Sequence, residues 1–193
     1  MPQISKREQI IEAATKLFHA DGFNATGIEG IREAANVSKK TLYNHFVSKE
    51  ELILTVLHRE DENIRNALMR GIDGLDKNPR ERLIGLFDLY ASWIHGDSFS
   101  GCLFIKAASE FSDPENKCKV VSTEAKRLAK QLTKQLVIDI EITDSQALTD
   151  QLNILIQGAM VQAHVVDDKS AIFMAKKIAI ILIDKAINEG NTK

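Results

Sequence analysis

The sequence has few prolines, few cysteines and no long apolar run, and each shortage excludes a class of protein. Three prolines and ten glycines in 193 residues leave no low-complexity linker, which favours helices that follow one another closely. The two cysteines, Cys102 and Cys118, are too few for a disulfide framework and lack the spacing of a zinc site. We therefore expect neither a disulfide-rich secreted protein nor a structural metal domain.

No segment of the sequence predicts contact with a membrane. The longest strongly apolar run, Ile178–Ile183, is far shorter than the roughly 20 residues needed to cross a bilayer. The first eight residues, Met1 to Glu8, lack the apolar core of a secretory signal. We expect a cytoplasmic protein without a membrane partner.

The motifs of common enzyme sites are also missing. The sequence contains no nucleophile elbow, phosphate-binding glycine loop, HExxH motif or CxxC pair. We therefore expect that the protein is not an enzyme and that it binds no cofactor and no metal. Two alternatives stay open. His58, Asp61 and Glu62 have the helical spacing of a metal site, although surface decoration is the commoner interpretation. Cys102 could be a redox sensor with Cys118 as its partner, although cysteines are more often buried and inert.

Charge is divided unevenly along the chain. Residues 1–49 hold seven Lys or Arg against five Asp or Glu, and the remaining residues hold 18 against 22. This mild basic excess does not by itself establish nucleic-acid binding.

Capping patterns indicate where several helices begin. Ser5–Glu8, Thr26–Glu29 and Ser48–Glu51 each place a Glu three residues after a hydroxyl, the pattern of a capping box, and Ser38 is a fourth hydroxyl cap. Helical periodicity continues to the end of the chain, and no stretch reads as a strand. We predict an all-α fold of about nine helices, with later helices covering 79 onward, 101–111, 113–138, 145–166 and 170–188.

The stretch from Thr26 to Leu52 has the pattern of a helix-turn-helix. A short helix over 26–35 is followed by Asn36, which tolerates the left-handed conformation of a sharp turn. A second short helix runs from Ser38 to about His45 and carries polar residues at its start, as a helix that enters the major groove does. The predicted DNA-binding residues are Thr26, Lys39, Lys40, Thr41, Tyr43, Asn44, His45 and Lys49.

These side chains suit recognition of DNA. Lys can contact phosphate or guanine, Asn can pair with adenine, and Thr can contact a base or a methyl group. Tyr hydroxyls and helix amino termini commonly hold phosphates, which makes Thr26 and Lys49 candidate phosphate contacts.

The same stretch resembles the DNA-binding signature of the Tet-repressor family. Val37-Ser38-Lys39, Leu42-Tyr43, His45-Phe46 and Ser48-Lys49-Glu50 carry the likeness, which covers roughly the first quarter of the chain. The family commonly has Gly where Asn36 and Lys40 stand, and Lys40 adds charge to the recognition helix. The resemblance implies a homodimeric regulator that binds a palindromic double-stranded operator. It favours a repressor, because most members of that family repress. It also implies a DNA-binding domain over 1–49 and a ligand-sensing and dimerisation domain over 50–193.

The two last predicted helices, 145–166 and 170–188, are the candidates for a dimer interface. Ile178–Ile183 is apolar on every side of its helix, so we expect it to be buried all round, by its own domain and a partner subunit. Plain intramolecular core is the alternative.

Residues in the middle of the chain predict an apolar sensor pocket with a few polar anchors. The candidate lining residues are Phe87, Tyr90, Trp93, Cys102, Phe104, Phe111, Gln157, Met160 and His164, although an aromatic stripe is more often core than pocket. The rival to a ligand-responsive regulator is a helical adaptor that does not bind DNA, in which changes to Lys40 or Tyr43 would leave function intact.

Overall fold

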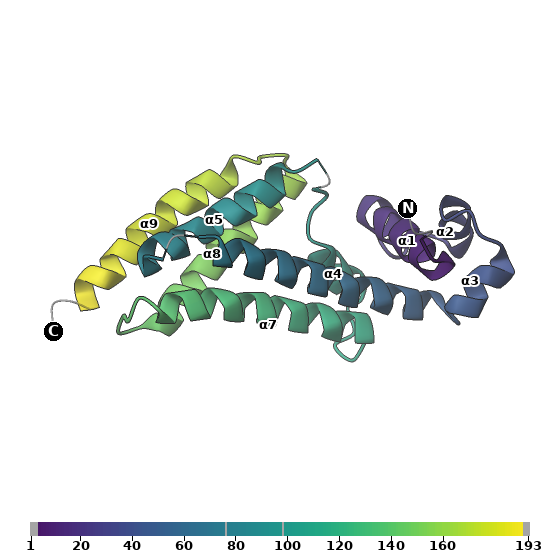
Figure 1. Cartoon of the computed structure of the whole chain (residues 1–193), viewed down its shortest axis with the longest axis horizontal. Coiled ribbons are helices and arrows are strands. Elements are labelled where there is room, and N and C mark those ends of the chain that lie inside the picture. The colour runs from purple at the N-terminus through teal and green to yellow at the C-terminus, as the bar shows by residue number, and fades with distance from the viewer. Residues whose placement is uncertain (1–3, 76, 98, 191–193) are drawn as a thin grey trace. The chain divides into compact units, whose positions relative to one another are not determined.

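The computed structural model describes residues 4–75, 77–97 and 99–190, and within these ranges the chain forms nine α-helices and no β-strand (Figure 1). The predicted all-α fold is therefore confirmed. In the described residues no helix is long and apolar enough to span a membrane. The helices are α1 (Lys6–Asp21), α2 (Ile28–Ala34), α3 (Lys39–His45), α4 (Lys49–Asp73), α5 (Pro79–His95), α6 (Leu103–Glu110), α7 (Lys117–Ile138), α8 (Ser145–Val165) and α9 (Ala171–Gly190).

Side chains cap several helices where the sequence predicts. The hydroxyls of Ser5 and Ser38 each accept a hydrogen bond from the main-chain N–H three residues on, at 3.2 and 3.0 Å. Asn78 accepts from two N–H groups of the first turn of α5, in which Pro79 is the first residue. These bonds satisfy N–H groups that have no partner inside the helix, and so they fix where each helix begins.

The predicted start of α2 at Thr26 is wrong. The helix begins at Ile28, and its cap residue, Gly27, makes no side-chain capping bond. The Thr26 hydroxyl donates instead to the carbonyl oxygen of Gly22 at 2.6 Å. Thr26 is 4% exposed, so its side chain closes the turn after α1 and is not available to cap α2.

The predicted start of α7 at Asp113 is also wrong, because α7 begins at Lys117. The Asp113 carboxylate accepts from the N–H of Glu115 at 2.9 Å and closes a separate turn. The side-chain oxygen of Asn116 then accepts from the N–H of Cys118 at 2.9 Å. Asn116 therefore caps the helix that the sequence assigned to Asp113.

The chain packs into two compact units. The head unit comprises residues 1–64 and 102–126, and the body unit comprises residues 65–101 and 127–193. One apolar cluster in the head unit joins α1, α2, α3 and the first half of α4 to α6 and the start of α7. The first 49 residues thus share their core with later segments. The predicted division at residue 49 stays a prediction about function, because packing follows other boundaries.

The core of the head unit is made of large side chains with almost no exposed surface. Burial of each such side chain contributes roughly 1.5–3 kcal/mol to folding. The largest of these that belong to the head unit are Phe18, Phe23, Phe46, Ile10, Ile11, Ile31, Leu42, Leu52 and Leu57.

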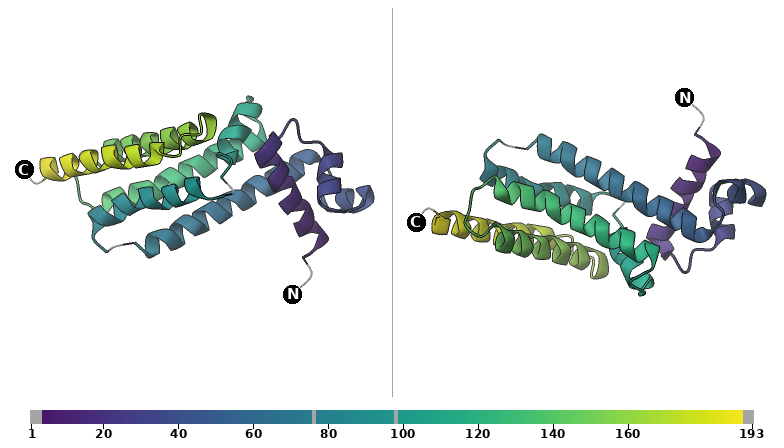
Figure 2. Two further views of the ribbon diagram at one scale, coloured as in Figure 1. Left: turned by 90° about the horizontal axis from the view of Figure 1, so that it is seen from above. Right: turned by 90° about the horizontal axis from the view of Figure 1, so that it is seen from below.

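In the body unit, α8 and α9 lie side by side, and α5 packs against both (Figure 2). Two ion pairs connect α5 to α9. Arg80 donates to both carboxylate oxygens of Asp184, at 2.6 and 2.9 Å, and Lys176 donates to Asp88 at 2.6 and 2.7 Å. The Arg80 guanidinium lowers the pKa of Asp184, so this pair is charged at neutral pH.

The apolar run in α9 is buried on one side only within the chain. Ala179 and Ile183 are fully buried, whereas Ile178 is 39% exposed and Ile181 is 66% exposed. The prediction that the chain's own domain buries one side of the run is confirmed. The opposite side has no cover from the described part of this chain.

Candidate DNA-binding site

Helix α3 presents a polar face that two buried side chains hold in place. Leu42 is fully buried and Phe46 is 1% exposed, so one side of this short helix is packed into the head unit. On the other side Tyr43 is 43% exposed. The predicted reading residues Lys39, Lys40, Tyr43, Asn44 and His45 are all exposed, and Thr41 is half-buried. The structure therefore brings six of the eight predicted DNA-binding residues to one short helix.

The turn between α2 and α3 has the predicted left-handed residue. Asn36 has a φ of 49°, a conformation that Asn tolerates better than most residues. Directly after it, the N–H of Val37 donates to the carbonyl oxygen of Arg32 at 3.2 Å, and Val37 is buried. This tight connection fixes the direction of α3 relative to α2.

The two predicted phosphate contacts outside α3 differ in what they can offer. Lys49 lies in the first turn of α4, and its Nζ donates to the carbonyl oxygen of Asn24 at 3.4 Å. This long bond leaves the ammonium close to the surface. Thr26 is turned inward, as described above, so a contact from this residue to a phosphate could come only from its main chain.

A network of four charged side chains, two carboxylates and two cations, links α2 to α3. Glu29 accepts from Nε of Arg32 at 2.8 Å, and its other oxygen pairs with Nζ of Lys39 at 3.0 Å. Arg32 also donates to Glu33 at 3.0 Å. Hydrogen bonds from Arg32 and then Lys39 lower the pKa of Glu29, and the bond to Glu29 raises the pKa of Lys39. The first residue of the predicted recognition helix is thus ion-paired in the free protein.

Helix α6 is hydrogen-bonded to the end of α1 and to the turn that follows it. The carboxylate of Glu110 accepts from the N–H groups of Phe23 at 2.9 Å and Asn24 at 2.6 Å. Lys106 donates to the carbonyl oxygen of His19 at 2.6 Å. Gly22, the residue after α1, has a φ of 86°, and a Cβ there would lie 2.6 Å from the Glu110 carboxylate. The approach of α6 therefore requires glycine at this position.

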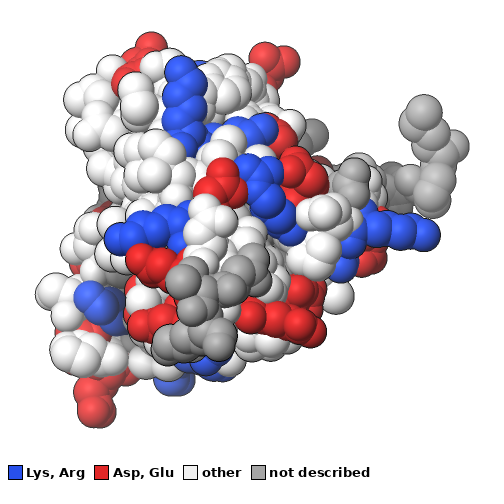
Figure 3. Space-filling view, turned by 90° about the vertical axis from the view of Figure 1, so that its left-hand side faces the viewer, with Lys and Arg blue, Asp and Glu red and all other residues white. Residues whose placement is uncertain are grey.

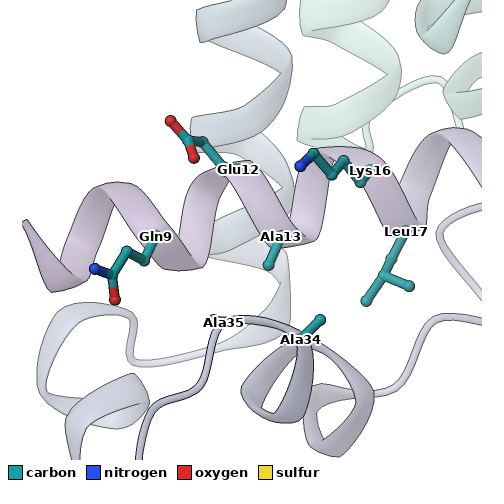
Figure 4. Close-up of a pocket in the computed structure, with 7 residues that line it drawn as sticks. All are labelled: Gln9, Glu12, Ala13, Lys16, Leu17, Ala34 and Ala35. Atoms are coloured by element: carbon teal, nitrogen blue, oxygen red, sulfur yellow. The ribbon is translucent and has the colours of Figure 1, made fainter. Parts of the chain in front are cut away.

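Small side chains leave an open cleft between α1 and α2 (Figure 4). Its volume is about 380 Å³, with Ala13, Leu17, Ala34 and Ala35 at its floor and polar residues of α1 at its rim. A second open groove, of about 320 Å³, lies between α6 and α7 and includes Phe104. Both are shallow surface features of the head unit.

One face of the molecule is shown with its charges in Figure 3. On that face Lys and Arg side chains are interspersed with Asp and Glu, so it carries no patch of a single sign of charge.

Comparison with known proteins identifies the helix-turn-helix. Residues 10–56, from α1 to the first turns of α4, match the family described as bacterial regulatory proteins, tetR family. The chain carries the DNA-binding helix-turn-helix of that family at these residues, and the relatives found are transcriptional regulators. The predicted family resemblance is confirmed.

Two relatives and one solved structure illustrate how far this TetR-family likeness extends. The activator FasR of Mycolicibacterium smegmatis is 33% identical over 126 residues, which cover 65% of this chain and 57% of FasR. The repressor KstR2 of Mycobacterium tuberculosis is 36% identical over 89 residues, 43% of this chain and 41% of KstR2. The matched stretches span about half the length of these two relatives. The TetR-family regulator SCO4454 of Streptomyces coelicolor has a TM-score of 0.83 at 22% identity, covering 96% of this chain and 95% of that one, and shares the fold.

The predicted sensor residues are divided between the two units of the chain. Cys102, Phe104 and Phe111 lie in the head unit, where the Phe111 ring is 5.7 Å from that of Phe23. In the body unit, Trp93 lies edge-on to Phe99 at 5.1 Å. Their exposure is graded: Phe87, Tyr90, Phe104 and Met160 are buried, Trp93, Cys102, Phe111 and Gln157 are half-buried, and His164 is exposed. Their role in binding a ligand stays a prediction.

The cysteine and metal alternatives gain no supporting geometry. Burial, and secondarily the charge of Glu50, raise the pKa of the Cys118 thiol to about 11, so little reactive thiolate forms near neutral pH. Among the described residues, no three His, Cys, Asp or Glu side chains lie close enough to hold a metal ion.

Sequence reasoning missed four side chains of this site. The spacing of Glu29 and Arg32 is that of a helical ion pair, so half of their network was readable in advance. Lys106 and Glu110 meet α1 from 87 residues away, and no local pattern signals such a contact.

Proposed function

We propose that the chain is a homodimeric, ligand-responsive repressor that binds a palindromic operator and is released by a small, largely apolar effector. The observation that carries the proposal is the exposed polar face of α3, anchored from behind by Leu42 and Phe46. A short helix held in this way is the element that helix-turn-helix proteins insert into the major groove.

The residues of that face divide by the contacts they can make. Lys40, Thr41 and Asn44 suit base edges, because their donors and acceptors match those displayed in the major groove. Tyr43 and Lys49 suit phosphates, which set the register of the protein without reading sequence. Lys39 and His45 complete the reading face, and Thr26 would contribute through its main chain.

An apolar stripe on α8 and α9 supports a homodimer. On α8, Ile154, Val161 and Val165 recur at the spacing of one helix face, with Gly158 between them, where an added Cβ would meet no atom within 4 Å. Bare glycine on such a face lets another helix approach closely. The exposed apolar residues of the two helices are Ile154, Val161, Val165, Phe173, Met174, Ile178 and Ile181, between 39% and 71% exposed. We propose that a second copy covers this stripe through α8 and α9.

We also propose separate roles for the two parts of the chain. Residues 1–49 would read DNA, and residues 50–193 would sense the effector and dimerise. The aromatic and apolar candidate sensor residues favour an effector with little charge. Repression is proposed as in KstR2, whereas FasR is named an activator. A regulator that binds operator DNA acts in the cytoplasm of a bacterial cell.

Selection of bound sequences from a random duplex pool tests the proposal directly. At near-physiological salt we expect enrichment of an inverted repeat whose half-sites lie about one helical turn apart. The Lys40→Ala/Asn44→Ala variant should lose that preference while Lys77→Ala, at an exposed residue of the body unit outside α8 and α9, keeps it. If neither wild type nor the control variant enriches any sequence above a salt-sensitive background, α3 does not read DNA. A helical adaptor then becomes the better interpretation.

A further inference from the structure

We propose that Glu29 limits the affinity of this protein for DNA by keeping Lys39 ion-paired and away from phosphates. The inference deepens the proposed function and rests on it, since it concerns the surface that would bind the operator. Glu29 acts through Lys39 and is a positioning residue.

The geometry places one carboxylate between two cations on different helices. One oxygen of Glu29 accepts from Arg32 at 2.8 Å on its own helix, and the other pairs with Lys39 at 3.0 Å on α3. Both oxygens of Glu29 are therefore engaged, and the ammonium of Lys39 is held toward α2. Glu29 and Lys39 are 56% and 66% exposed, so the pair lies on the surface that a DNA duplex would approach.

The helix-turn-helix carries few cations, so pairing one of them with a carboxylate changes how many are available to phosphates. Residues 26–49 contain four cations, Arg32, Lys39, Lys40 and Lys49, and two carboxylates, Glu29 and Glu33. Glu29 engages two of those four cations. The pKa of Glu29 is lowered and that of Lys39 is raised, so both groups are charged at neutral pH.

Stability of the head unit does not explain the network. An exposed ion pair of this kind contributes little to folding, because solvent screens it and long side chains lose freedom in it. Its effect on DNA binding is larger. Each phosphate that a cation neutralises releases a counterion and steepens the salt dependence of binding. A phosphate that takes Lys39 must first displace Glu29, and the carboxylate left behind repels the backbone.

The consequence is binding that depends less on phosphates and more on base contacts. Phosphate contacts favour every sequence equally, and they supply nearly all of the affinity for random DNA. With Lys39 withheld, the protein has one cation fewer with which to bind random DNA. Lys40 and Asn44 are outside the network and stay available to bases.

The experiment measures affinity for one random-sequence duplex over a series of salt concentrations, with the full chain. Compared with wild type, Glu29→Gln should bind about five to ten times more tightly near 0.1 M salt, and its log–log salt slope should steepen by about one. Glu33→Gln is the matched control. It makes the same change of charge one helical turn away, at a residue that pairs with Arg32 and not with Lys39, and it should move the slope by much less.

A double-mutant cycle tests whether Glu29 acts through Lys39. In a Lys39→Gln background, Glu29→Gln should leave the salt slope unchanged. Equal slope changes in Glu29→Gln and Glu33→Gln, or the same Glu29→Gln effect with and without Lys39, would overturn the proposal. Weaker binding of Glu29→Gln only to duplexes that carry a particular cytosine would overturn it too, because the carboxylate would then read a base. If wild type binds no duplex at any salt concentration, the proposed function itself fails.

Discussion

The exposed face of α3 and the exposed stripe of α8 and α9 are both candidate binding surfaces, but their chemical character is opposite. The α3 face is polar and charged, and part of its charge is already neutralised by Glu29. The α8 and α9 stripe is apolar, and Ile154, Val165 and Ile181 are each more than 60% exposed. A polar surface is stable in water without its partner, whereas exposed apolar surface is stabilised by constant cover. The first therefore suits a partner that comes and goes, and the second a permanent one.

Breaking the apolar stripe should have the largest effect. We expect Ile181→Glu to weaken dimerisation about 100-fold or more, since a buried carboxylate without a partner is strongly unfavourable at an interface. Operator affinity should fall with it, because one head would then bind one half-site. Sedimentation equilibrium and operator titration measure both quantities.

Val120→Glu is the control for that variant. Val120 is 52% exposed and lies on α7 in the head unit, so an added carboxylate there should leave the mass in solution unchanged. A dimer that survives Ile181→Glu intact would show that the stripe is not the interface.

The second prediction concerns the contact of α6 with the turn after α1, in the head unit that carries the polar face of α3. Gly22→Ala should lower the free energy of unfolding by roughly 2–3 kcal/mol, because Gly22 has a positive φ and its added Cβ would collide with Glu110. Gly30→Ala, inside α2 with open space around the Cβ, should instead stabilise by about 0.5–1 kcal/mol. Urea denaturation distinguishes the two, and a tolerated Gly22→Ala would mean that α6 is not held closely against this turn.

The third prediction separates two kinds of contact on the α3 side. Tyr43→Ala and Lys49→Ala should weaken binding to all sequences alike, and Lys49→Ala should also flatten its salt dependence, because it removes a cation. Lys40→Ala and Asn44→Ala should change which sequence is preferred, by roughly 1–3 kcal/mol at the affected base pair. Unchanged preference in both of the latter variants would remove the recognition role of α3.

The smallest effect at neutral pH is expected for Cys118. Its folded pKa of about 11 exceeds its ordinary value of 9.0, so the neutral thiol is favoured by folding. This contribution is complete below pH 9 and is lost as the pH rises toward 11, amounting to roughly 2–3 kcal/mol. Urea titrations at pH 8 and pH 11 should show this loss for wild type and not for Cys118→Ala. An equal loss in both would show that the thiol is not its source.

The parts of the molecule that were predictable from sequence are those set by neighbours along the chain. Ser38 caps the N–H three residues on, and Asn36 accepts a conformation that most residues avoid. Both signals are local, and both predictions are confirmed. Thr26 has the same capping-box pattern as Ser48, whose hydroxyl accepts from the N–H of Glu51. The Thr26 hydroxyl bonds instead to the carbonyl oxygen of Gly22, in the turn after α1. Where two local contacts compete for one side chain, the capping pattern alone does not decide between them.

Apart from the helical pair of Glu29 with Arg32, the contacts that sequence reasoning missed join separate elements of the fold. Glu110 reaches Phe23 and Asn24 across 86 or 87 residues, and Lys39 meets Glu29 across the turn between two helices. Exposure was equally hard to foresee. The run at Ile178–Ile183 is apolar throughout, but only the fold shows which of its side chains, such as Ile181, have no cover.

The shared core of the head unit has a consequence for how the protein is made. Leu103, Phe104 and Ala107 of α6 and Cys118 and Ala125 of α7 belong to the same apolar cluster as α1, α2 and α3. During synthesis, which adds roughly 5–20 residues per second, the DNA-reading helices leave the ribosome several seconds before these partners exist. The nascent chain cannot close this core until residue 125 has emerged. A nascent chain that stalls before that point lacks part of the apolar core on which the DNA-binding helices pack.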